Sequence, residues 1–316
     1  MERRLISALV GLTVAVATYF LIDSNAYATC DKTTGNIIDY TPGATQVRND
    51  GTPGDNCQDI PDAYQITFSK IGVCTANPSP TAAINGAPDY ASCEFIYDGT
   101  PLVHEINFPN AQPLLIPPFT IPPNTYPFFV VTFSSQLGIK NTITFDQNVT
   151  ARVGSTGSTC WTSGGRTSFN NEVVATVHGA TLAGNTPTMD CGLESAAAPQ
   201  FNFEVFPLFQ GNTNCATDFM TDAKFSNGSI TEVGIGGGTF LARLLKAGGQ
   251  YADRCTNSAQ ILWVITFPTP KVVSPTSTFE LAFKLTDSVS IDFDGGTGNI
   301  VKVGNDPIQA IFTVTD

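Results

Sequence analysis

Hydrophobic and polar residues alternate along most of the chain beyond residue 60. The segment 63–74 (AYQITFSKIGVC) places Tyr64, Ile66 and Phe68 on one face, which is the two-residue period of a half-buried strand. The segment 126–133 (YPFFVVTF) is continuously apolar and predicts a strand that is buried on both faces. Further strand patterns follow at 93–99, 102–108, 141–153, 171–182, 200–209, 260–267, 277–293 and 308–316.

Segments rich in glycine, proline, asparagine and aspartate separate these strand patterns. Many short strands with regular turn signals predict an all-β fold, namely an elaborated antiparallel β-sandwich of the Greek-key or jelly-roll kind. Within it, residues 93–108 predict a β-hairpin, because Asp98-Gly99 joins two strand-like runs. At most one short helix is expected, at 239–247, where Gly248-Gly249 could form its C-cap.

The stretch 113–133 is almost wholly apolar and carries six prolines. Proline is unsuited to a helix interior and cannot donate a hydrogen bond to a sheet ladder. We therefore expect a turn at 122–125 that leads 128–133 into the core as a strand. Residues 113–121 are expected to form an extended apolar strip that lies on the sandwich or on a neighbouring molecule.

An export signal is expected at the start of the chain. Arg3 and Arg4 are followed by an apolar run and then by Ala26-Tyr27-Ala28. This order of basic, apolar and small residues is that of a secretory signal peptide over residues 1–28, although the apolar run is also long enough for an uncleaved membrane anchor. Cleavage would release a secreted chain, extracellular or held at the cell surface, with no later segment apolar enough to span a membrane.

The exported part is expected to consist of an arm and one domain. Residues 29–60 are polar and turn-rich and predict an N-terminal arm, with an ordered loop or an edge strand of the sandwich as alternatives. Residues 61–316 carry the strand patterns and predict a single β-sandwich domain. Two domains divided near 190–215 are the alternative, but no linker-like composition marks that boundary.

All eight cysteines lie after residue 28, and an even number of cysteines in an exported chain predicts four disulfides. Eight cysteines allow about 105 pairings, and we predict that neighbours along the chain pair. The absence of a C-x-x-C motif argues against a zinc ribbon or a thioredoxin-like redox site. The predicted pairs are Cys30–Cys57, Cys74–Cys93, Cys160–Cys191 and Cys215–Cys255.

The charge of the chain excludes some classes of partner. The formal net charge is −12, while only 13% of the residues are charged. Nucleic acids and anionic lipid surfaces bind proteins that present basic stripes or patches. Neither a nucleic acid nor an anionic membrane surface is therefore an expected partner.

No familiar catalytic motif is visible, and we predict that the chain is not an enzyme. The two histidines, His104 and His178, lie in strand-like segments, where packing is the simpler interpretation. The chain contains neither G-x-S-x-G nor H-E-x-x-H. Carboxylates that could face each other across a cleft, as in a glycosidase, occur without a specific pattern: Glu172, Glu204, Glu280 and Asp292.

Two acidic, glycine-rich loops offer the oxygen ligands that calcium prefers, although solvated turns have the same composition. No other cofactor is expected. Trp161 follows Cys160 in the Ser- and Gly-rich segment 154–165 and is a candidate ligand-contacting ring, with packing against a disulfide as the alternative. The calcium candidates are Asp50, Asp55 and Asp59 in 49–59, and Asp292, Asp294 and Asn299 in 292–299.

The segment AYQITFSKIGVC (63–74), followed by IPPNTYPFFVVTF (121–133), resembles a pattern of secreted bacterial β-sandwich proteins. These include surface and filament subunits of the TasA-like and other donor-strand-assembled kinds. In this pattern a strand that ends in a cysteine precedes a proline-rich turn and a buried strand. The resemblance implies a non-enzymatic, self-assembling role, while the eight cysteines depart from it.

The leading hypothesis is a structural subunit of an extracellular filament or cell-surface assembly that polymerises with copies of itself by β-strand addition. The donor strand is expected in the arm at 29–48 or in the C-terminal strand 308–316. A secreted adhesin that binds a glycan or another surface protein through 76–89 and 154–165 is the alternative, and an exported hydrolase is a third. The expected assembly residues are Ile37, Ile38, Tyr40, Val47, Leu114, Leu115, Ile116 and Phe119.

Overall fold

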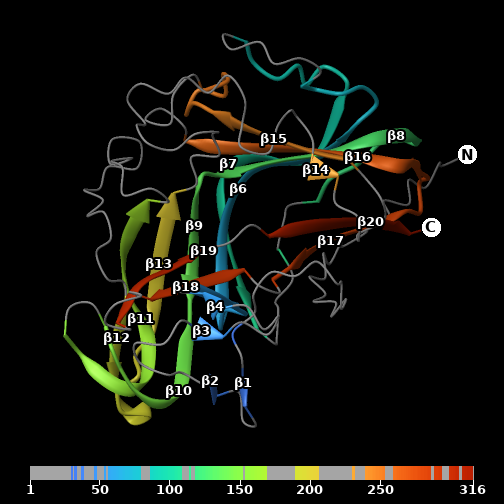
Figure 1. Cartoon of the computed structure of the whole chain (residues 1–316). Helices are drawn as coiled ribbons and strands as arrows, with labels where there is room; N and C mark the ends of the chain where they lie inside the picture. Colours follow the sequence, from blue (N-terminus) through green and yellow to red (C-terminus); the bar gives the residue numbers. More distant parts are fainter. Residues whose placement is uncertain are drawn as a thin grey trace, which may run out of the picture.

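The computed structural model of the chain is an all-β structure, as predicted (Figure 1). Among the described residues, the helical structure consists of a single 3₁₀ turn, η1 (Glu194–Ala196). No helix in this part of the chain is long and apolar enough to cross a membrane. The predicted signal peptide, 1–28, lies outside the described residues, which are 30, 32–33, 37–38, 46–47, 53–54, 56–79, 86–108, 114, 118–151, 154–168, 189–205, 230–231, 239–252, 259–285, 288–293, 299–305 and 308–315.

Thirteen of the described strands form one main sheet. Most neighbouring strands are antiparallel, but β2 is parallel to β10 and β11 is parallel to β13, so the sheet is mixed rather than purely antiparallel. Two strands lie beside the main path: β7 (Cys93–Asn107) pairs with β6, and β12 (Met189–Gly192) pairs with β11. The spatial order of the others is β1 (Lys32–Thr33), β2 (Ile37–Ile38), β10 (Thr142–Thr150), β11 (Thr156–Ser168), β13 (Gln200–Val205), β9 (Gln136–Lys140), β6 (Ala63–Cys74), β8 (Asn124–Ser134), β16 (Gln260–Val273), β15 (Thr239–Leu245) and β14 (Ile230–Thr231).

Two of the smaller sheets pack against the main sheet and complete the sandwich. In Figure 1 their red strands lie across the blue and green strands of the main sheet. One small sheet pairs β17 with β20, a second has the order β19-β18-β5, and a two-stranded ribbon pairs β3 with β4. Their bounds are β17 (Thr278–Lys284), β20 (Gln309–Thr315), β19 (Ile300–Asn305), β18 (Val289–Phe293), β5 (Asn56–Asp59), β3 (Gln46–Val47) and β4 (Pro53–Gly54).

Aromatic pairs hold the layers together. Phe129 of β8 stacks on Phe312 of β20 with the ring centroids 4.3 Å apart, and Phe145 of β10 meets Phe293 of β18 edge to face at 6.0 Å. Burial of each phenylalanine contributes about 1.5–3 kcal/mol, and an aromatic pair adds about 0.5–1.5 kcal/mol. These contacts fix the two small sheets against the main sheet.

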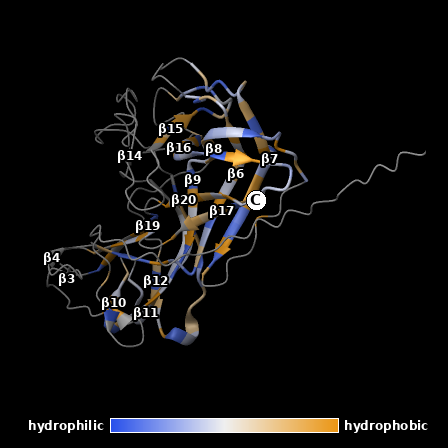
Figure 2. Cartoon of the chain, turned by 90° about the vertical axis from the view of Figure 1, so that its right-hand side faces the viewer, coloured by the Kyte–Doolittle hydropathy of each residue, from blue (hydrophilic) through white to orange (hydrophobic). Residues whose placement is uncertain are grey.

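Strand β8 is buried on both faces, as the apolar run at 126–133 predicted. Phe129, Val131 and Phe133 lie in the main core, whereas Val130 points the opposite way into a second cluster. Figure 2 shows hydrophobic residues, in orange, along the strands around β8, β15 and β16. The second cluster consists of Cys74, Val130, Leu245, Tyr251, Leu262 and Val264, with half-buried Tyr90, Cys93, Phe95, Phe128 and Leu241 around it.

The predicted helix at 239–247 is wrong, because these residues form β15, which pairs antiparallel with β16 along its whole length. Ala242 and Leu244 lie in the main core, while Leu245 lies in the second cluster. The strand therefore buries apolar side chains on both faces, and this packing overrides the helix propensity of Ala, Leu and Arg. Gly249, with φ of +82°, belongs to the turn after β15 and not to a helix C-cap.

The predicted hairpin at 93–108 is also wrong, because β7 is one continuous strand along β6. The register shifts between Phe68 and Lys70 of β6, which pair with Leu102 and Asp98 of β7. Ser69 therefore stands opposite residues 99–101, which have no paired partner in β6. The Asp98-Gly99 signal therefore marks a bulge and not a turn. Strand β6 continues past this point, so it provides β7 with pairing partners on both sides of the bulge.

Three of the four predicted disulfides are confirmed, and no described cysteine is free. Two of them join residues that stand directly opposite in antiparallel ladders, with Cα atoms 4.0 Å apart in each. Such cross-strand bridges staple the ends of neighbouring strands. The confirmed pairs are Cys30–Cys57, Cys74–Cys93 and Cys160–Cys191, while Cys215 and Cys255 lie outside the described residues.

Candidate functional site

Strand β7 has a long unpaired edge. It pairs with β6 along its length and with no other strand among the described residues, and it is the outermost labelled strand on the right of Figure 2. The strands that end the main path of the sheet, β1 and β14, are each only two residues long. Because an unpaired edge presents backbone N–H and C=O groups to its surroundings, β7 is the principal candidate for an interaction site.

The hydrogen-bond pattern shows which backbone groups of β7 point away from β6. The N–H of Phe108 donates to the carbonyl of Asp62 at 2.8 Å, so these opposed residues form a hydrogen-bonded pair. Hydrogen-bonded and non-hydrogen-bonded pairs alternate along an antiparallel ladder. The outward N–H and C=O groups therefore belong to Val103, Glu105 and Asn107.

The first half of β7 is guarded against pairing, and the second half is not. Near the bulge, Asp98 forms an ion pair with Lys70, and Pro101 has no N–H to donate. Charges, prolines and bulges are the usual means by which an edge strand avoids unwanted pairing. From Leu102 to Asn107 the pairing with β6 is regular. This segment contains no proline, lysine or bulge, and its one acidic side chain, Glu105, lies near Lys140.

The two faces of the unguarded segment differ. His104 and Ile106 point inward and are buried, whereas Val103 is 57% exposed. Glu105 lies on the same face as Val103, and its carboxylate is 3.8 Å from the ammonium group of Lys140. An exposed apolar side chain beside outward backbone groups is suited to strand addition, in which the backbone gives affinity and alternate side chains give specificity.

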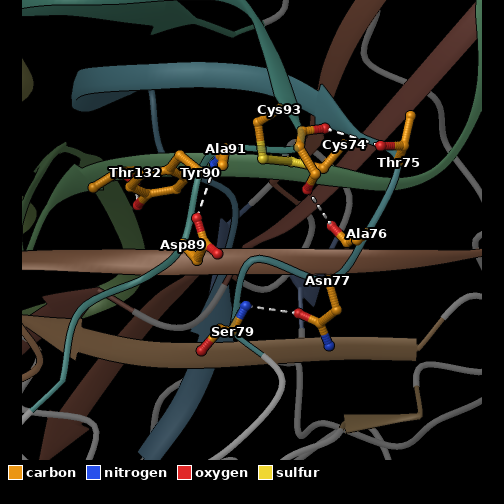
Figure 3. The surroundings of a disulfide bond; sticks show 11 residues. Cys74, Thr75, Ala76, Asn77, Ser79, Asp89, Tyr90, Ala91, Cys93 and Thr132 are labelled. Carbon is orange, nitrogen blue, oxygen red and sulfur yellow. Dashed lines mark hydrogen bonds between the residues drawn. A yellow bond between two sulfur atoms is a disulfide. The ribbon is translucent and has the colours of Figure 1, made fainter.

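The Cys74–Cys93 disulfide closes one end of the β6–β7 pair (Figure 3). Beyond it the chain stays paired for one more step, since the N–H of Thr75 donates to the carbonyl of Ser92 at 2.9 Å. The hydroxyl of Ser92 in turn donates to the carbonyl of Ala76 at 3.2 Å. The described part of the 76–89 segment is therefore held firmly beside the edge strand.

A buried polar contact anchors the same segment to the outer face of the sheet. The hydroxyl groups of Ser79 and Tyr251 are 2.7 Å apart, and Arg243 donates to Ser79 Oγ at 3.3 Å. The guanidinium group also lies 3.7 Å from the centroid of the Tyr251 ring. Because arginine stays protonated and cannot accept a proton from serine, this contact anchors the loop and does not activate a nucleophile.

Half-buried aromatic rings next to β7 are covered by a lysine. The ammonium group of Lys70 lies 5.6 Å from the Tyr90 centroid and 5.0 Å from the Phe95 centroid, and the two rings meet edge to face. Burial raises the pKa of the Tyr90 hydroxyl. A sugar stacked on these rings would have to compete with the lysine.

Comparisons with family models, with curated proteins and with solved structures find no match to this chain. The resemblance drawn from 63–74 and 121–133 therefore stays an expectation. The functional conclusion rests on the geometry, in which β7 has the longest edge that pairs with no described strand.

Within 29–60, the side chains described at 30, 32, 38, 57 and 59 are held to the sandwich. Ile38 is 1% exposed and belongs to the main core. Cys30 is bonded to Cys57, and Lys32 forms an ion pair with Asp59. In the single chain these residues therefore fit the alternative expectation, an edge strand of the sandwich, and not a free N-terminal arm. Tyr40 lies outside the described residues, and only the backbone of Ile37 and Val47 is described.

The described residues of the proline-rich strip lie on the sandwich of their own chain. Leu114 is buried, and the ring of Phe119 lies 5.7 Å from that of Phe279 in β17. In the single chain these two assembly candidates are therefore already covered. Leu115 and Ile116 lie outside the described residues.

The loop predicted at 154–165 is wrong, because β11 begins at Thr156 and lies between β10 and β13. Trp161 is only 8% exposed. Its ring packs over Gly192, where an added Cβ atom would lie 3.2 Å from the ring. The ring is therefore packed against β12, as in the alternative of a packed tryptophan, but not against the disulfide, because Cys160 and Trp161 are consecutive in β11 and point to opposite faces. Trp161 does not present its ring to a ligand.

The calcium candidates do not gather into a site among the described residues. The buried carboxylate of Asp59 accepts a hydrogen bond from Ile60 N–H at 2.7 Å and pairs with the Lys32 ammonium, which supplies the positive charge that calcium would otherwise bring. The fold does place the two predicted segments side by side, because β5 pairs with β18. Within the described chain, no three His, Cys, Asp or Glu side chains cluster. Asp50, Asp55 and Asp294 lie outside it, only the backbone of Asp292 is described, and Asn299 is half-buried.

Among the carboxylate candidates, Glu204 is completely buried. The backbone N–H of Asn305 donates to Glu204 Oε2 at 2.7 Å, and the side-chain amide of Asn305 donates to the carbonyl of Leu137 at 3.0 Å. These bonds link β13, β19 and β9, so Glu204 supports the fold. Glu280 is half-buried, Glu172 and His178 lie outside the described residues, and the side chain of Asp292 is not described.

The edge of β7 is not among the features that the sequence pattern predicts. The pattern at 102–108 predicts a strand, but as one half of a hairpin through Asp98-Gly99. Alternation of apolar and polar residues does not distinguish an edge strand from a central one. The lack of proline and lysine in 102–107 was the one local signal that could have indicated an unguarded edge.

His104 is expected to make the stability of this region depend on pH. Its Nε2 is buried without a hydrogen-bond partner among the described residues, and burial lowers the pKa of the imidazole from its usual 6.5. Because the unfolded chain binds the proton more readily, the free energy of unfolding is highest above about pH 6.5. It decreases as the pH falls below this value and through the lower pKa of the folded state. Urea unfolding between about pH 7 and pH 5 should show a steeper loss for the wild type than for His104→Gln. Equal pH slopes for the two proteins would contradict this expectation.

Proposed function

We propose that this chain is a structural, non-catalytic subunit of an extracellular assembly that joins copies of itself by β-strand addition at the outer edge of β7. The observation that carries the proposal is the regular, unguarded segment 102–107. Its outward backbone groups, on Val103, Glu105 and Asn107, have no described strand to pair with. A strand laid along this edge would supply the hydrogen bonds that β7 does not make to a described strand.

The confirmed disulfides support a place outside the reducing cytosol. Disulfides persist in exported proteins and are rare where glutathione and thioredoxin keep thiols reduced. The three confirmed pairs therefore fit export, in keeping with the predicted signal peptide over 1–28. The resemblance to TasA-like and other donor-strand-assembled subunits supports the same proposal.

A structural role is also supported by the burial of three side chains that were candidates for catalysis or ligand binding. Glu204 is hydrogen-bonded into the sandwich, His104 is buried in the edge strand, and Trp161 packs against β12. These three side chains are packed inside the fold, and Glu204 also joins two strands by a hydrogen bond. The alternative of a glycan- or protein-binding adhesin has fewer observations behind it, because Trp161 is buried and Lys70 covers the rings of Tyr90 and Phe95.

The proposal predicts that two changes at Val103 abolish assembly without unfolding the protein. Val103→Pro removes an outward N–H and leaves the ladder with β6 intact, and Val103→Lys adds a charge of the kind that guards natural edges. Val272→Lys is the matched control, since Val272 is an equally exposed valine, at 61%, in β16.

Sedimentation velocity and negative-stain microscopy of the exported protein measure assembly, and near-ultraviolet circular dichroism checks the fold. We expect the wild type and Val272→Lys to assemble, while both Val103 variants stay folded and monomeric. A wild-type protein that remains monomeric at high concentration would refute the proposal, and so would Val103→Pro that assembles like the wild type.

A further inference from the structure

We infer that the strand added to β7 is the β7 strand of a second copy, which lies antiparallel to the first about a two-fold axis at His104. This inference rests on the proposed function, because it names the partner of the same edge. It differs from the donor-strand expectation, in which the N-terminal segment or the C-terminal strand of one copy would complete the sheet of the next.

Neither expected donor is available in the described chain. The N-terminal segment is held at Cys30 by the bond to Cys57 and at Lys32 by the ion pair to Asp59, and Ile38 is in the core. A donor that starts at Cys30 would have to enter the neighbouring copy as a disulfide-closed loop.

The C-terminal strand is engaged in a similar way. Strand β20 pairs with β17 over its full length, from Gln309 to Thr315, and Phe312 stacks on Phe129 with the ring centroids 4.3 Å apart. Its donation to another copy would open this ladder and uncover the aromatic core. Strand β7, in contrast, can pair without detaching anything from its own chain.

The geometry of the sheet favours an isologous contact between two β7 edges. A head-to-tail extension of the main sheet needs a second long edge on that sheet, but its described path ends in the two-residue strands β1 and β14. The seven-residue strands β17 and β20 belong to a separate two-stranded sheet. Two identical strands that pair antiparallel satisfy each other through a two-fold axis, which is the commonest symmetry of protein oligomers. The contact closes as a dimer, so a longer assembly would use a second contact elsewhere.

The backbone and the charges set the register. Outward residues must pair with outward residues, so about an axis at His104 the ladder is built from Val103 and Glu105 of each copy, while Asn107 stands opposite Pro101. An axis at Glu105 would place two glutamates opposite each other, which is unfavourable. An axis at His104 instead pairs Val103 of each copy with Glu105 of the other and leaves Glu105 near Lys140.

The same register gives the buried imidazole a partner. His104 Nε2 has no hydrogen-bond partner among the described residues, although a buried polar atom without a partner is costly. At the axis, the two His104 side chains would stand opposite each other. A neutral imidazole has one donor and one acceptor nitrogen, so one ring can donate to the other once the side chains turn toward the axis, because Nε2 is covered by its own chain in the single copy.

Cysteine cross-linking tests the axis. Opposed residues in a hydrogen-bonded antiparallel pair have Cα atoms about 5.5 Å apart, which lies within the range of about 4.4–6.8 Å for disulfides. Val103→Cys and Glu105→Cys proteins are oxidised separately and as an equimolar mixture, with Val272→Cys as the control, and mass spectrometry identifies the bridged peptides. We expect the mixture to form at least about tenfold more disulfide-linked dimer than either protein alone, with the bridge between positions 103 and 105.

The outcomes separate this inference from the proposed function. Assembly by sedimentation without a 103–105 cross-link in the mixture would overturn the inference and leave the proposed function standing. Cross-linking of Glu105→Cys with itself would overturn the axis at His104. A protein that is monomeric under all conditions would overturn both.

Discussion

Replacement of both Cys160 and Cys191 by alanine is expected to lower the free energy of unfolding by about 3–4 kcal/mol. The two cysteines are 31 residues apart in sequence and stand directly opposite each other in β11 and β12. In the chain-entropy model, a bridge of this loop length removes many conformations from the unfolded chain. Both cysteines are also buried in the main core, so their replacement leaves a packing defect.

Urea unfolding at neutral pH, followed by tryptophan fluorescence, measures this loss. The double variant Cys74→Ala/Cys93→Ala is the matched comparison, because that bridge is also cross-strand but spans only 19 residues. Its loss should be somewhat smaller. A change of less than about 1 kcal/mol for the Cys160/Cys191 variant would show that the bridge does not stabilise the fold as expected.

Gly157→Ala is expected to destabilise the same part of the sheet by about 3 kcal/mol or more. A Cβ atom at this position would lie 2.2 Å from the carbonyl oxygen of Gly192 and 2.3 Å from its Cα atom. Both are backbone atoms, so a rotation of a side chain cannot relieve the overlap. The strands β11 and β12 would have to separate, which would strain the Cys160–Cys191 bridge and the packing of Trp161.

Gly99→Ala is the control for this substitution. An added Cβ atom at Gly99 meets only the end of the Tyr97 side chain, at 3.2 Å, and that side chain can move. Thermal unfolding should therefore place Gly157→Ala well below the wild type and Gly99→Ala close to it. If Gly157→Ala melts at the wild-type temperature, β12 does not approach β11 as closely as the structure shows.

Some elements were predictable because their signal is local. The continuous apolar run at 126–133 requires burial on two sides wherever the strand lies, and β8 is buried in that way. Neighbouring cysteines also pair as predicted, since strands that follow each other in sequence often lie side by side. Cys74 and Cys93 end one such pair of strands, β6 and β7.

Other elements were not predictable because partners distant in sequence decide them. The segment 239–247 has residues that favour a helix, yet it pairs with β16 as a strand. A strand places side chains on both faces of the sheet, so this segment contributes to both apolar clusters. Asp98-Gly99 has the residues of a hairpin turn, yet β6 is long enough to pair with both flanking runs. Trp161 has polar neighbours in sequence, yet β12 covers it.

The sequence by itself determined the class of this protein: an all-β, disulfide-stapled chain with no familiar catalytic motif. These properties follow from periodicity, composition and the number of cysteines, which are carried by each segment alone. Only the tertiary structure decided that β7 pairs on one side alone among the described strands. It also decided which candidate residues are buried by packing. An edge is a property of the whole sheet, because a strand such as β7 has one only when no other segment pairs beside it.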